Sequence, residues 1–397
     1  MKKKILYIWK DKYPWDVRVE KVCKALYDAG YEVFILARNK GETTQKEIID
    51  GLNIIRVGGK STMLTLPVPK NPIWNSAIKD TVRAIKPDLI IVREIMLAAA
   101  SAKIGKTNYI SDKSISPKKS IPVIIDMAEN YPAAMRDWRK YNKNFLSRFI
   151  VHSLKIPDIV EKQAVNLCDG IIVVCDEQIE RLEKQYKFPP SKIAVVHNTP
   201  TLSNFKNANY FSSKPPKILC HHGFLSAEKS ITNLLLGFEI AAENKNIELI
   251  IAGSGECEDE YKELVSKFRN KNKIHFLGKY DYQTLPQILD KSDIGVIPYQ
   301  INDFNNYTIH NKLFDYFALC KPVLASTANP LIRILNETKA GLAMDFSNEK
   351  NAAFAIEEIL KADIETMSKN ALDAAQKKYN WDIDAKILCD FIARFVG

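Results

Sequence analysis

The stretch from Asn311 to Val323 carries the residue types with the clearest chemical use in the chain. It reads N-K-L-F-D-Y-F-A-L-C-K-P-V, which predicts a loop, then a helix, and then Lys-Pro leading into a strand. A helix N-terminus presents unpaired N–H groups and the positive end of the helix dipole, and both suit a diphosphate. Lys312 adds a cation there, and Asp315, about one turn into the helix, can accept hydrogen bonds from two ribose hydroxyls. The alternative interpretation is an ordinary α/β helix with an exposed aspartate.

Glycine-containing turns follow three other apolar runs in the same half of the chain. The segment from His222 to Lys229 reads H-G-F-L-S-A-E-K, and its lysine is either a phosphate contact or a solvated residue at a helix start. Residues 253–255 (G-S-G) let the backbone approach a ligand closely, although the same pattern occurs in tight turns between strand and helix. Residues 278–280 (G-K-Y) end a further run, and Tyr280 is either a stacking partner for a base or a surface tyrosine.

Polar residues also stand at the ends of two apolar runs in the first half. Asp16 and Arg18 head a helix-like stretch, where Asp16 equally suits a plain helix N-cap. Asp126 and Glu129 end a later run and lie three residues apart, with Asn130 beside them.

Short apolar runs rich in β-branched residues recur along the chain, separated by helix-like segments. Continuous rather than alternating apolar runs are typical of buried parallel strands. The predicted strands of the first half are Lys4–Trp9, Glu32–Arg38, Asn53–Val57, Leu89–Glu94, Val123–Glu129, Gly170–Asp176 and Ile193–Asn198. Those of the second half are Lys217–Gly223, Ile247–Gly253, Ile274–Gly278, Ile294–Tyr299, Pro322–Ser326 and Gly341–Asp345.

The polar segment 199–216 contains three prolines and is interpreted as a linker. Two strand–helix series joined by a linker predict an α/β protein of two doubly wound Rossmann-like domains. The expected N-terminal domain covers residues 1–205 and the expected C-terminal domain residues 206–379, with a C-terminal helix at 380–397 packing back on the first domain. Ligands of such sheets bind beyond the carboxyl ends of the strands, so the site is expected in the cleft between the domains.

The motifs bear a resemblance to one enzyme family. The block from Asn311 to Val323 resembles the N-K-L-F-E-Y-M-A-x-G-K-P-V stretch of retaining glycosyltransferases of family 4 (glycosyl transferases group 1), which have the GT-B fold. The segment from His222 to Lys229 is similar to that family's G-R-L-x-x-E-K-G loop, whose arginine and lysine clamp the donor phosphates. Residues 253–255 match its G-x-G turn, and residues 13–20 are similar to its acceptor-side loop.

The resemblance implies transfer of a sugar from a nucleotide-diphosphate sugar to a glycan or lipid-linked acceptor, with retention, in bacterial surface polysaccharide synthesis. It implies no cofactor and no metal, because cations and dipoles would offset the phosphate charge. The implied catalytic residues are Lys229, Lys312, Glu129 and Asp126. The implied donor-binding residues are Gly223, Phe224, Gly253, Gly255, Gly278, Tyr280, Tyr307, Thr308, Asn311 and Asp315, and those on the acceptor side are Asp16, Arg18 and Asn130.

Three positions depart from the family pattern. Phe224 replaces the loop arginine and Ser230 replaces the glycine that follows the lysine. Tyr307 stands where the family has the first of two glutamates, and Asp315 conservatively occupies the second position. These departures leave the donor sugar open. They also leave two alternatives: a non-catalytic or partner-dependent subunit, and a nucleotide-sugar epimerase on the same fold.

The charge of this 397-residue chain is uneven. The net charge is +10, and the first 200 residues hold 34 basic and 22 acidic side chains, so the second half is nearly neutral. Residues 101–150 alone hold 10 basic and 4 acidic side chains, and residues 136–150 interleave cations with aromatic rings. This composition is typical of a helix on an anionic membrane surface, of a site for single-stranded nucleic acid, or of an amphipathic helix that covers its own domain. The motifs argue against nucleic acid.

The remaining composition bears on location. The seven cysteines form no C-x-x-C pair, and neither they nor the six histidines show zinc spacing, which favours reduced thiols and no metal. The apolar run at the N-terminus is short for a signal peptide. The expected location is therefore the cytoplasm, with peripheral attachment at the inner face of the cell membrane if the basic segment binds lipid.

Overall fold

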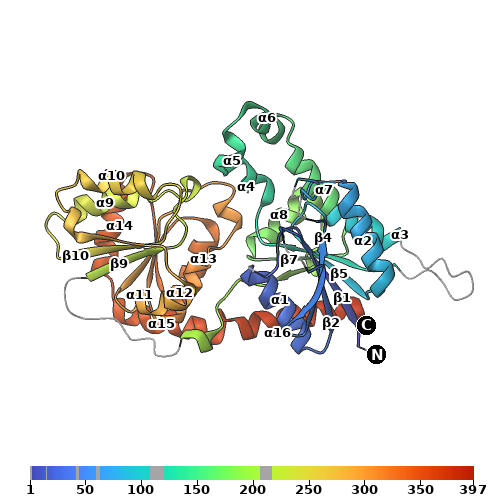
Figure 1. Ribbon diagram of the computed structural model, residues 1–397. Helices are drawn as coiled ribbons and strands as arrows, with labels where there is room; N and C mark the ends of the chain where they lie inside the picture. The colour runs from blue at the N-terminus through green and yellow to red at the C-terminus, as the bar shows by residue number, and fades with distance from the viewer. Residues whose placement is uncertain (1, 15, 42–43, 60–62, 108–119, 206–216) are drawn as a thin grey trace, which may run out of the picture. The chain divides into compact units, whose positions relative to one another are not determined.

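The computed structural model describes residues 2–14, 16–41, 44–59, 63–107, 120–205 and 217–397 (Figure 1). The chain forms two compact units. Unit 1 comprises Met1–Arg136, Lys143–Val196 and Ala385–Gly397, and unit 2 comprises Asp137–Asn142 and His197–Asp384. Each unit is a mostly parallel sheet with helices, so the predicted pair of doubly wound α/β domains is confirmed.

Unit 1 is built on an eight-stranded sheet in the order β3-β4-β2-β1-β5-β6-β7-β8. Its strands are β1 (Lys4–Trp9), β2 (Glu32–Arg38), β3 (Lys46–Ile49), β4 (Leu52–Val57), β5 (Leu89–Arg93), β6 (Val123–Met127), β7 (Gly170–Val173) and β8 (Ile193–Val195). All neighbours pair in parallel except β3 and β4, which are antiparallel. The sequence did not predict β3, because this four-residue strand lies at the sheet edge and none of its residues is buried.

The helices of unit 1 connect successive strands. They are α1 (Val17–Asp28), α2 (Pro72–Ile85), α3 (Ala98–Thr107), α4 (Tyr131–Asp137), α6 (Phe145–Arg148), the π-helical turn η1 (Phe149–Ser153), α7 (Ile156–Leu167) and α8 (Glu177–Tyr186). The helix-like stretch predicted at Asp16 and Arg18 is confirmed as α1. The side chain of Asp16 accepts a hydrogen bond from the Val19 N–H at 2.9 Å, so Asp16 is the N-cap of α1.

Unit 2 is built on six parallel strands in the order β11-β10-β9-β12-β13-β14. They are β9 (Lys217–His222), β10 (Ile247–Ala252), β11 (Ile274–Gly278), β12 (Ile294–Ile297), β13 (Val323–Ser326) and β14 (Gly341–Met344). Each was predicted within two residues of these bounds. The predictions ran slightly long because apolar residues such as Tyr299 continue past the last ladder hydrogen bond into the loops that carry the polar groups.

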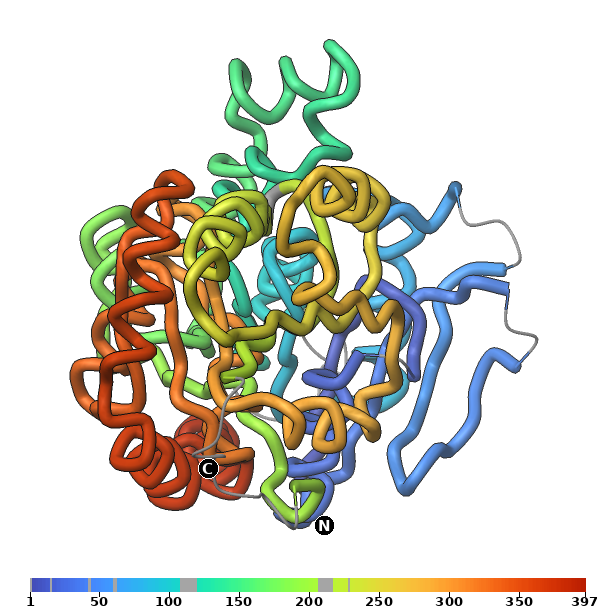
Figure 2. Tube along the Cα trace, turned by 90° about the vertical axis from the view of Figure 1, so that its left-hand side faces the viewer, coloured from blue at the N-terminus to red at the C-terminus, as the bar shows by residue number. Residues whose placement is uncertain are grey.

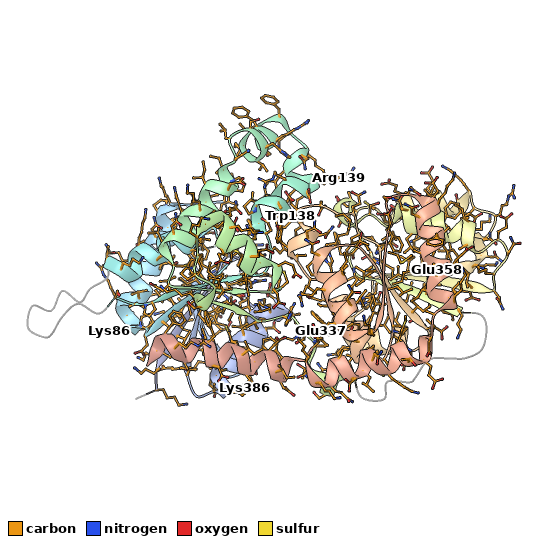
Figure 3. All side chains as sticks on the ribbon, turned by 180° about the vertical axis from the view of Figure 1, so that it is seen from behind. Lys86, Trp138, Arg139, Glu337, Glu358 and Lys386 are labelled. Carbon is orange, nitrogen blue, oxygen red and sulfur yellow. The ribbon has the colours of Figure 1, made fainter. Side chains whose placement is uncertain are left out.

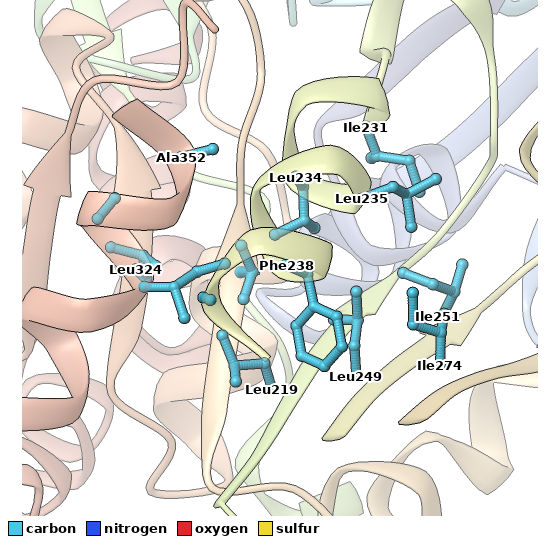
Figure 4. Packing of buried hydrophobic residues seen from close by; sticks show 14 of the residues in the cluster. Leu219, Ile231, Leu234, Leu235, Phe238, Leu249, Ile251, Ile274, Leu324 and Ala352 are labelled. Carbon is cyan, nitrogen blue, oxygen red and sulfur yellow. The ribbon is translucent and has the colours of Figure 1, made fainter. Parts of the chain in front are cut away.

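The helices of unit 2 cover both faces of this sheet (Figure 1). They are α9 (Thr232–Ala241), α10 (Glu258–Ser266), α11 (Leu285–Leu289), α12 (Lys312–Ala318), α13 (Asn329–Thr338), α14 (Glu349–Lys361) and α15 (Ile364–Lys377). The short helix α5 (Arg139–Asn142) also belongs to unit 2 but does not cover its sheet. On one face, Leu234 and Phe238 of α9 pack on Leu219 and Leu249 of the sheet, and Ala352 of α14 closes the cluster (Figure 4). This core holds the sheet edge that carries the candidate site.

The last helix, α16 (Trp381–Val396), begins in unit 2, and from Ala385 onward it belongs to unit 1. In unit 1, Phe391 and Phe395 lie against Gly170 of β7, where a side chain on the glycine would collide with both rings. In unit 2, buried Asp384 accepts hydrogen bonds from the His197 N–H at 3.1 Å and the Thr199 hydroxyl at 2.5 Å. These bonds place the described start of the predicted linker in unit 2.

Candidate functional site

The strand order of unit 2 reverses at β9, whose neighbours are β10 and β12. In a doubly wound sheet such a reversal opens a crevice at the carboxyl ends of the strands, where ligands bind. Three of the turns predicted from the sequence meet there. Gly223 donates a hydrogen bond to the Ala252 carbonyl at 2.8 Å, and Gly253 donates one to the Gly278 carbonyl at 2.9 Å. Leu225 donates to the Ser254 carbonyl at 3.1 Å, so the turns form one rigid backbone edge.

Lys312 is a buried lysine at this edge. It lies at the start of α12, is only 8% exposed, and donates a hydrogen bond to the Tyr299 hydroxyl. Its ammonium group also lies 4.5 Å from the centre of the Tyr299 ring. A Cβ placed on Gly223 would be 3.3 Å from Lys312 Nζ, so the amine lies directly beside the loop in which Phe224 replaces an arginine. A cation is therefore available at this loop from a different element.

Burial, and then the charge of Lys229, lower the pKa of Lys312 well below the usual range of lysine, and Asp315 only partly opposes this. Two cations near one another in a buried place are costly unless an anion joins them. Lys229 lies in the short helical turn η4 (Ala227–Lys229) and is partly exposed. The two lysines therefore form an incompletely neutralised positive site, which is what an anionic diphosphate requires.

Asp315 lies one turn further into α12 and is almost fully buried. It accepts a hydrogen bond from the Tyr282 hydroxyl at 2.6 Å, and its other oxygen lies 3.9 Å from His222 Nε2. Burial, and then the charge of Lys312, lower the pKa of His222 well below its ordinary value, so this histidine is neutral at neutral pH. His222 contacts the Tyr280 hydroxyl through Nδ1 at 3.0 Å. Tyr280 is thus hydrogen-bonded to His222, whose other ring nitrogen lies near Asp315 without a hydrogen bond to it.

The N-terminal turn of α12 offers fewer unpaired donors than the sequence suggested. The helix has seven residues, and the N–H groups of Leu313, Phe314 and Asp315 already bond to carbonyls of residues 310 and 311. A phosphate group at this edge would therefore depend on the lysine side chains more than on the helix end. Of the other residues predicted beside α12, Thr308 is buried, Tyr307 is half-buried and Asn311 is exposed. Phe224, in the opposite loop, is 62% exposed.

Sequence reasoning did not assign a role to several aromatic groups around Lys312. His221 donates a hydrogen bond from Nδ1 to the Val296 carbonyl at 2.9 Å, and both His221 and His310 lie edge-on to the Tyr299 ring. Burial lowers the pKa of both histidines well below the ordinary value. The available signal was the His-His pair at the end of β9, since side chains at the carboxyl ends of parallel strands face the binding edge.

The glycine at 253 is required by close backbone packing. It has φ +144°, and a Cβ there would lie 1.9 Å from the Gly223 carbonyl oxygen. We expect Gly253→Ala to lower the free energy of unfolding by at least about 2 kcal/mol, because the clash is with backbone. Gly278→Ala is the control: φ is +67°, but nothing lies within 4 Å of the added carbon, so about 1 kcal/mol is expected. Equal losses in urea unfolding of the two variants would contradict the steric explanation.

Arg18, predicted on the acceptor side, and Asp126, predicted as catalytic, form a buried ion pair in unit 1. Asp126 is 0% exposed, and its carboxylate contacts Arg18 Nη2 at 2.7 Å and the Tyr7 hydroxyl at 2.7 Å. Arg93 lies 3.8 Å away. Burial alone would raise the pKa of Asp126, but the Arg18 and Arg93 charges outweigh it, and the pKa is lowered. Contact between Asp126 and a substrate would require this buried pair to open.

The neighbouring predicted residues differ in exposure. Asn130 is buried and its side-chain oxygen accepts from the Ala133 N–H at 3.4 Å, at the start of α4. Glu129 is partly exposed at the end of the β6 loop. Of the carboxylates predicted here, Glu129 is therefore the one that solvent reaches.

A second polar group in unit 1 was not found from the sequence. The sheet order of this unit reverses at β1, which pairs with β2 and β5. Just beyond β1, Lys10 forms an ion pair with Glu94 and donates to the Tyr131 hydroxyl at 2.7 Å. Glu94 has φ +65°, an unusual backbone conformation for a residue with a side chain. Strain of this kind is often found at functional sites, so this edge is a candidate position for a ligand in unit 1.

The described residues contain no group of three or more His, Cys, Asp and Glu side chains arranged to hold a metal ion. The groups gathered at the two sheet edges are instead lysines, neutral histidines, tyrosine hydroxyls and single carboxylates. Such groups bind anions and hydroxyls.

Comparison with known families gives matches over both halves of the chain. A family model described as "Glycosyl transferases group 1" matches residues 204–379, and one described as "Glycosyltransferase Family 4" matches residues 16–199. An uncharacterized glycosyltransferase of Methanocaldococcus jannaschii is 25% identical over 229 residues, which cover 54% of this chain and 57% of the relative. The matches cover 57% to 62% of the length of the curated relatives.

Two solved structures show the same architecture. Sucrose-phosphate synthase from Thermosynechococcus elongatus matches with a TM-score of 0.73 and 17% identity over 99% of both chains. Anabaena HepE in complex with UDP matches with a TM-score of 0.68 and 14% identity, over 98% of this chain and 100% of the other. At these identities, the matches establish a shared fold.

Proposed function

The chain belongs to the GT-B glycosyltransferases of the group 1 and family 4 type, and on that premise we propose that it transfers a sugar from a nucleotide-diphosphate sugar to a glycan or a lipid-linked acceptor. The observation that carries the proposal is the group formed by buried Lys312, partly exposed Lys229 and buried Asp315, where the strand order of unit 2 reverses. UDP in the HepE structure is consistent with a nucleotide donor. Retention of the anomeric configuration and a role in bacterial surface polysaccharide synthesis are part of the proposal and rest on the family resemblance.

Departure of the nucleoside diphosphate is the step that the lysines would assist. Negative charge grows on the diphosphate as the bond to the sugar breaks, and preorganised cations in a water-poor site stabilise that charge strongly. Lys312 is buried beside Gly223, and Lys229 is close enough for its charge to lower the pKa of Lys312. In the proposed mechanism these two lysines offset the charge without a metal.

Groups at the other end of the same sheet edge would recognise the nucleoside. Asp315 accepts from Tyr282 through one oxygen, and ribose hydroxyls can donate to the remaining lone pairs of its carboxylate. Burial, and then the charge of Asp315, raise the pKa of both Tyr280 and Tyr282, so both hydroxyls stay protonated. Tyr280, linked to neutral His222, is placed to contact the base or the ribose.

Donor turnover tests the proposal. Hydrolysis and transfer would be measured with UDP-, GDP- and ADP-sugars for the native chain, Asp315→Ala and Lys229→Met. We expect each variant to lower kcat/KM by about 10²-fold, since each removes charged contacts made to the donor. Asp290→Ala and Lys291→Met, which change exposed residues near the end of α11, are the matched controls and should retain native turnover.

Two results would contradict transferase activity. If no nucleotide sugar binds, the replacements at Phe224 and Tyr307 mark a non-catalytic subunit of a partner enzyme. If the donor binds and its sugar is converted to an epimer without any acceptor, the chain is a nucleotide-sugar epimerase. Turnover that survives in both Asp315→Ala and Lys229→Met would place the donor site elsewhere.

A further inference from the structure

A short segment of unit 1 exposes large apolar side chains beside cations. Residues 143–159 comprise α6, the turn η1 and the start of α7. Phe145 is 84% exposed and Leu146 is 66% exposed, values usual for charged residues rather than for core residues. The further exposed apolar residues of the segment are Phe149, Leu154, Ile156 and Ile159. We call residues 143–159 the apolar tip.

The apolar tip projects from its own unit. Figures 1 and 2 both show α6 and the turn after it standing away from the sheet of unit 1. Figure 3 shows ring-bearing side chains pointing outward at the end of this projection. The interpretation of this region as a helix that covers its own domain therefore fails for α6, although Val151 and Val160 below it are buried and anchor the segment.

Local hydrogen bonds fix the backbone conformation of the apolar tip. The Asn144 side chain caps α6 by accepting from the Ser147 N–H at 2.8 Å. The Leu154 N–H then bonds to the Phe149 carbonyl at 3.0 Å, an i to i+5 bond that makes η1 a π-helical turn. π-Helical turns are rare and often occur at functional positions. The rings of Phe145 and Phe149 stack with centres 6.2 Å apart, so they form one apolar surface.

The charge around the apolar tip has one sign. The sequence from residue 138 to residue 157 contains five Lys and Arg and no Asp or Glu. Lys143, Arg148 and Lys155 are all exposed, and they form no salt bridge with a described carboxylate. Asp137 and Asp158 flank this stretch, and Asp158, at the end of the apolar tip, pairs with Arg136 at 2.8 Å. The rings therefore stand among uncompensated cations.

We propose that the apolar tip is a docking surface for an anionic lipid bilayer. Aromatic and aliphatic side chains inserted at the headgroup level, with cations on the lipid phosphates, are the chemistry of an interfacial membrane segment. The complementary charge of an anionic bilayer supports this occupant. No helix formed by the described residues is long and apolar enough to cross a bilayer. The sequence placed the basic region at residues 101–150, of which residues 108–119 lie outside the described residues. The structure assigns docking to the apolar tip instead of to that whole region.

Vesicle sedimentation tests this proposal without any donor or acceptor, so its outcome is independent of the proposed transferase activity. The native chain would be mixed with phosphatidylcholine vesicles or with vesicles containing phosphatidylglycerol. We expect binding only to the anionic vesicles, weakening as salt rises. A triple charge-reversal variant should partition onto anionic vesicles about 100-fold or more weakly, since each cation near the surface contributes about fivefold. Its substitutions are Lys143→Glu, Arg148→Glu and Lys155→Glu. Phe145→Ser/Leu146→Ser should also reduce partitioning, with little effect on thermal unfolding because both residues are exposed.

The matched control is a second triple variant, Lys79→Glu/Lys192→Glu/Lys291→Glu. It makes the same change in net charge at three exposed lysines that form no salt bridge with a described carboxylate, and it should retain vesicle binding. Equal binding to neutral and anionic vesicles, or equal losses in the control and in the charge-reversal variant, would overturn the proposal. Binding to single-stranded nucleic acid without binding to anionic vesicles would overturn it in favour of the other anionic partner.

Discussion

Replacing Lys312 by methionine is expected to lower kcat/KM for the nucleotide-sugar donor by about 10²–10³-fold, the usual loss when one preorganised charge-stabilising group is removed. The same replacement should leave thermal stability unchanged or slightly raised. Lys312 is buried and burial lowers its pKa, so an apolar side chain of similar length removes a desolvated amine from the interior. Lost activity with retained stability distinguishes a ligand-binding lysine from a structural one.

The pH dependence follows from the same lysine. Burial and the Lys229 charge lower the pKa of Lys312 in the free protein, with Asp315 and Cys220 acting in the opposite direction. A bound diphosphate favours the charged amine, so it raises this pKa and binding takes up a proton between the free and bound values. Donor affinity should therefore be highest on the acidic side of this window and fall as the pH rises through it.

Calorimetry in two buffers of different ionisation enthalpy would measure the proton uptake, using a nucleotide sugar that binds. Lys312→Met should abolish the uptake, whereas Lys291→Met should not change it. No proton uptake in the native chain, or the same uptake in Lys312→Met, would contradict this assignment. A large loss of stability in Lys312→Met would instead indicate that the bond to Tyr299 is mainly structural.

The second large effect concerns the buried pair of Asp126 and Arg18. Asp126→Asn is expected to lower the free energy of unfolding by about 3–5 kcal/mol, because it leaves the buried guanidinium groups of Arg18 and Arg93 without their counter-charge. The matched control is Asp158→Asn. Its pair with Arg136 is nearly as short, at 2.8 Å, but the Asp158 side chain is 27% exposed, so about 1 kcal/mol or less is expected.

The contribution of the same pair to the free energy of unfolding depends on pH. The pKa of Asp126 is lower in the folded protein than in the unfolded chain, so its stabilising contribution is fully present above the unfolded value of about 3.9. It is lost as the pH falls through the folded value. Urea unfolding at pH 7 and at acid pH should show a smaller difference between native protein and Asp126→Asn in acid. Similar destabilisation by both aspartate substitutions at pH 7 would contradict the role of burial.

Most of the strands could be predicted from the sequence because buried parallel strands need continuous apolar residues. Lys4–Trp9 and Ile274–Gly278 were predicted with the bounds that they have. The edge strand β3 was missed, because an edge that faces solvent puts no such demand on its residues. The turns at 223, 253 and 278 were also predicted as parts of one site, since each follows a strand and the carboxyl ends of parallel strands meet.

The chemical state of the site depended on contacts that no local pattern encodes. Lys312 is a candidate cation in the sequence, but its burial, its bond to Tyr299 and its position beside Gly223 join residues from three segments. Asp126 was predicted to contact a substrate, but it accepts a hydrogen bond in the protein interior from Arg18, which is 108 residues away in the chain. The sequence of residues 136–150 is equally typical of a helix that covers its own domain and of a helix that docks on a membrane. Only the exposure of Phe145 distinguishes these two interpretations.

The sequence by itself therefore determined the two-domain α/β fold, the family and the turns that meet at one edge of the second sheet. These follow from local composition and short motifs, because strand burial and turn geometry act over a few residues. The tertiary structure decided which charged groups are desolvated, which are paired and which apolar residues face solvent. Desolvation and pairing depend on all neighbours in space, and those neighbours come from segments that are distant in the chain.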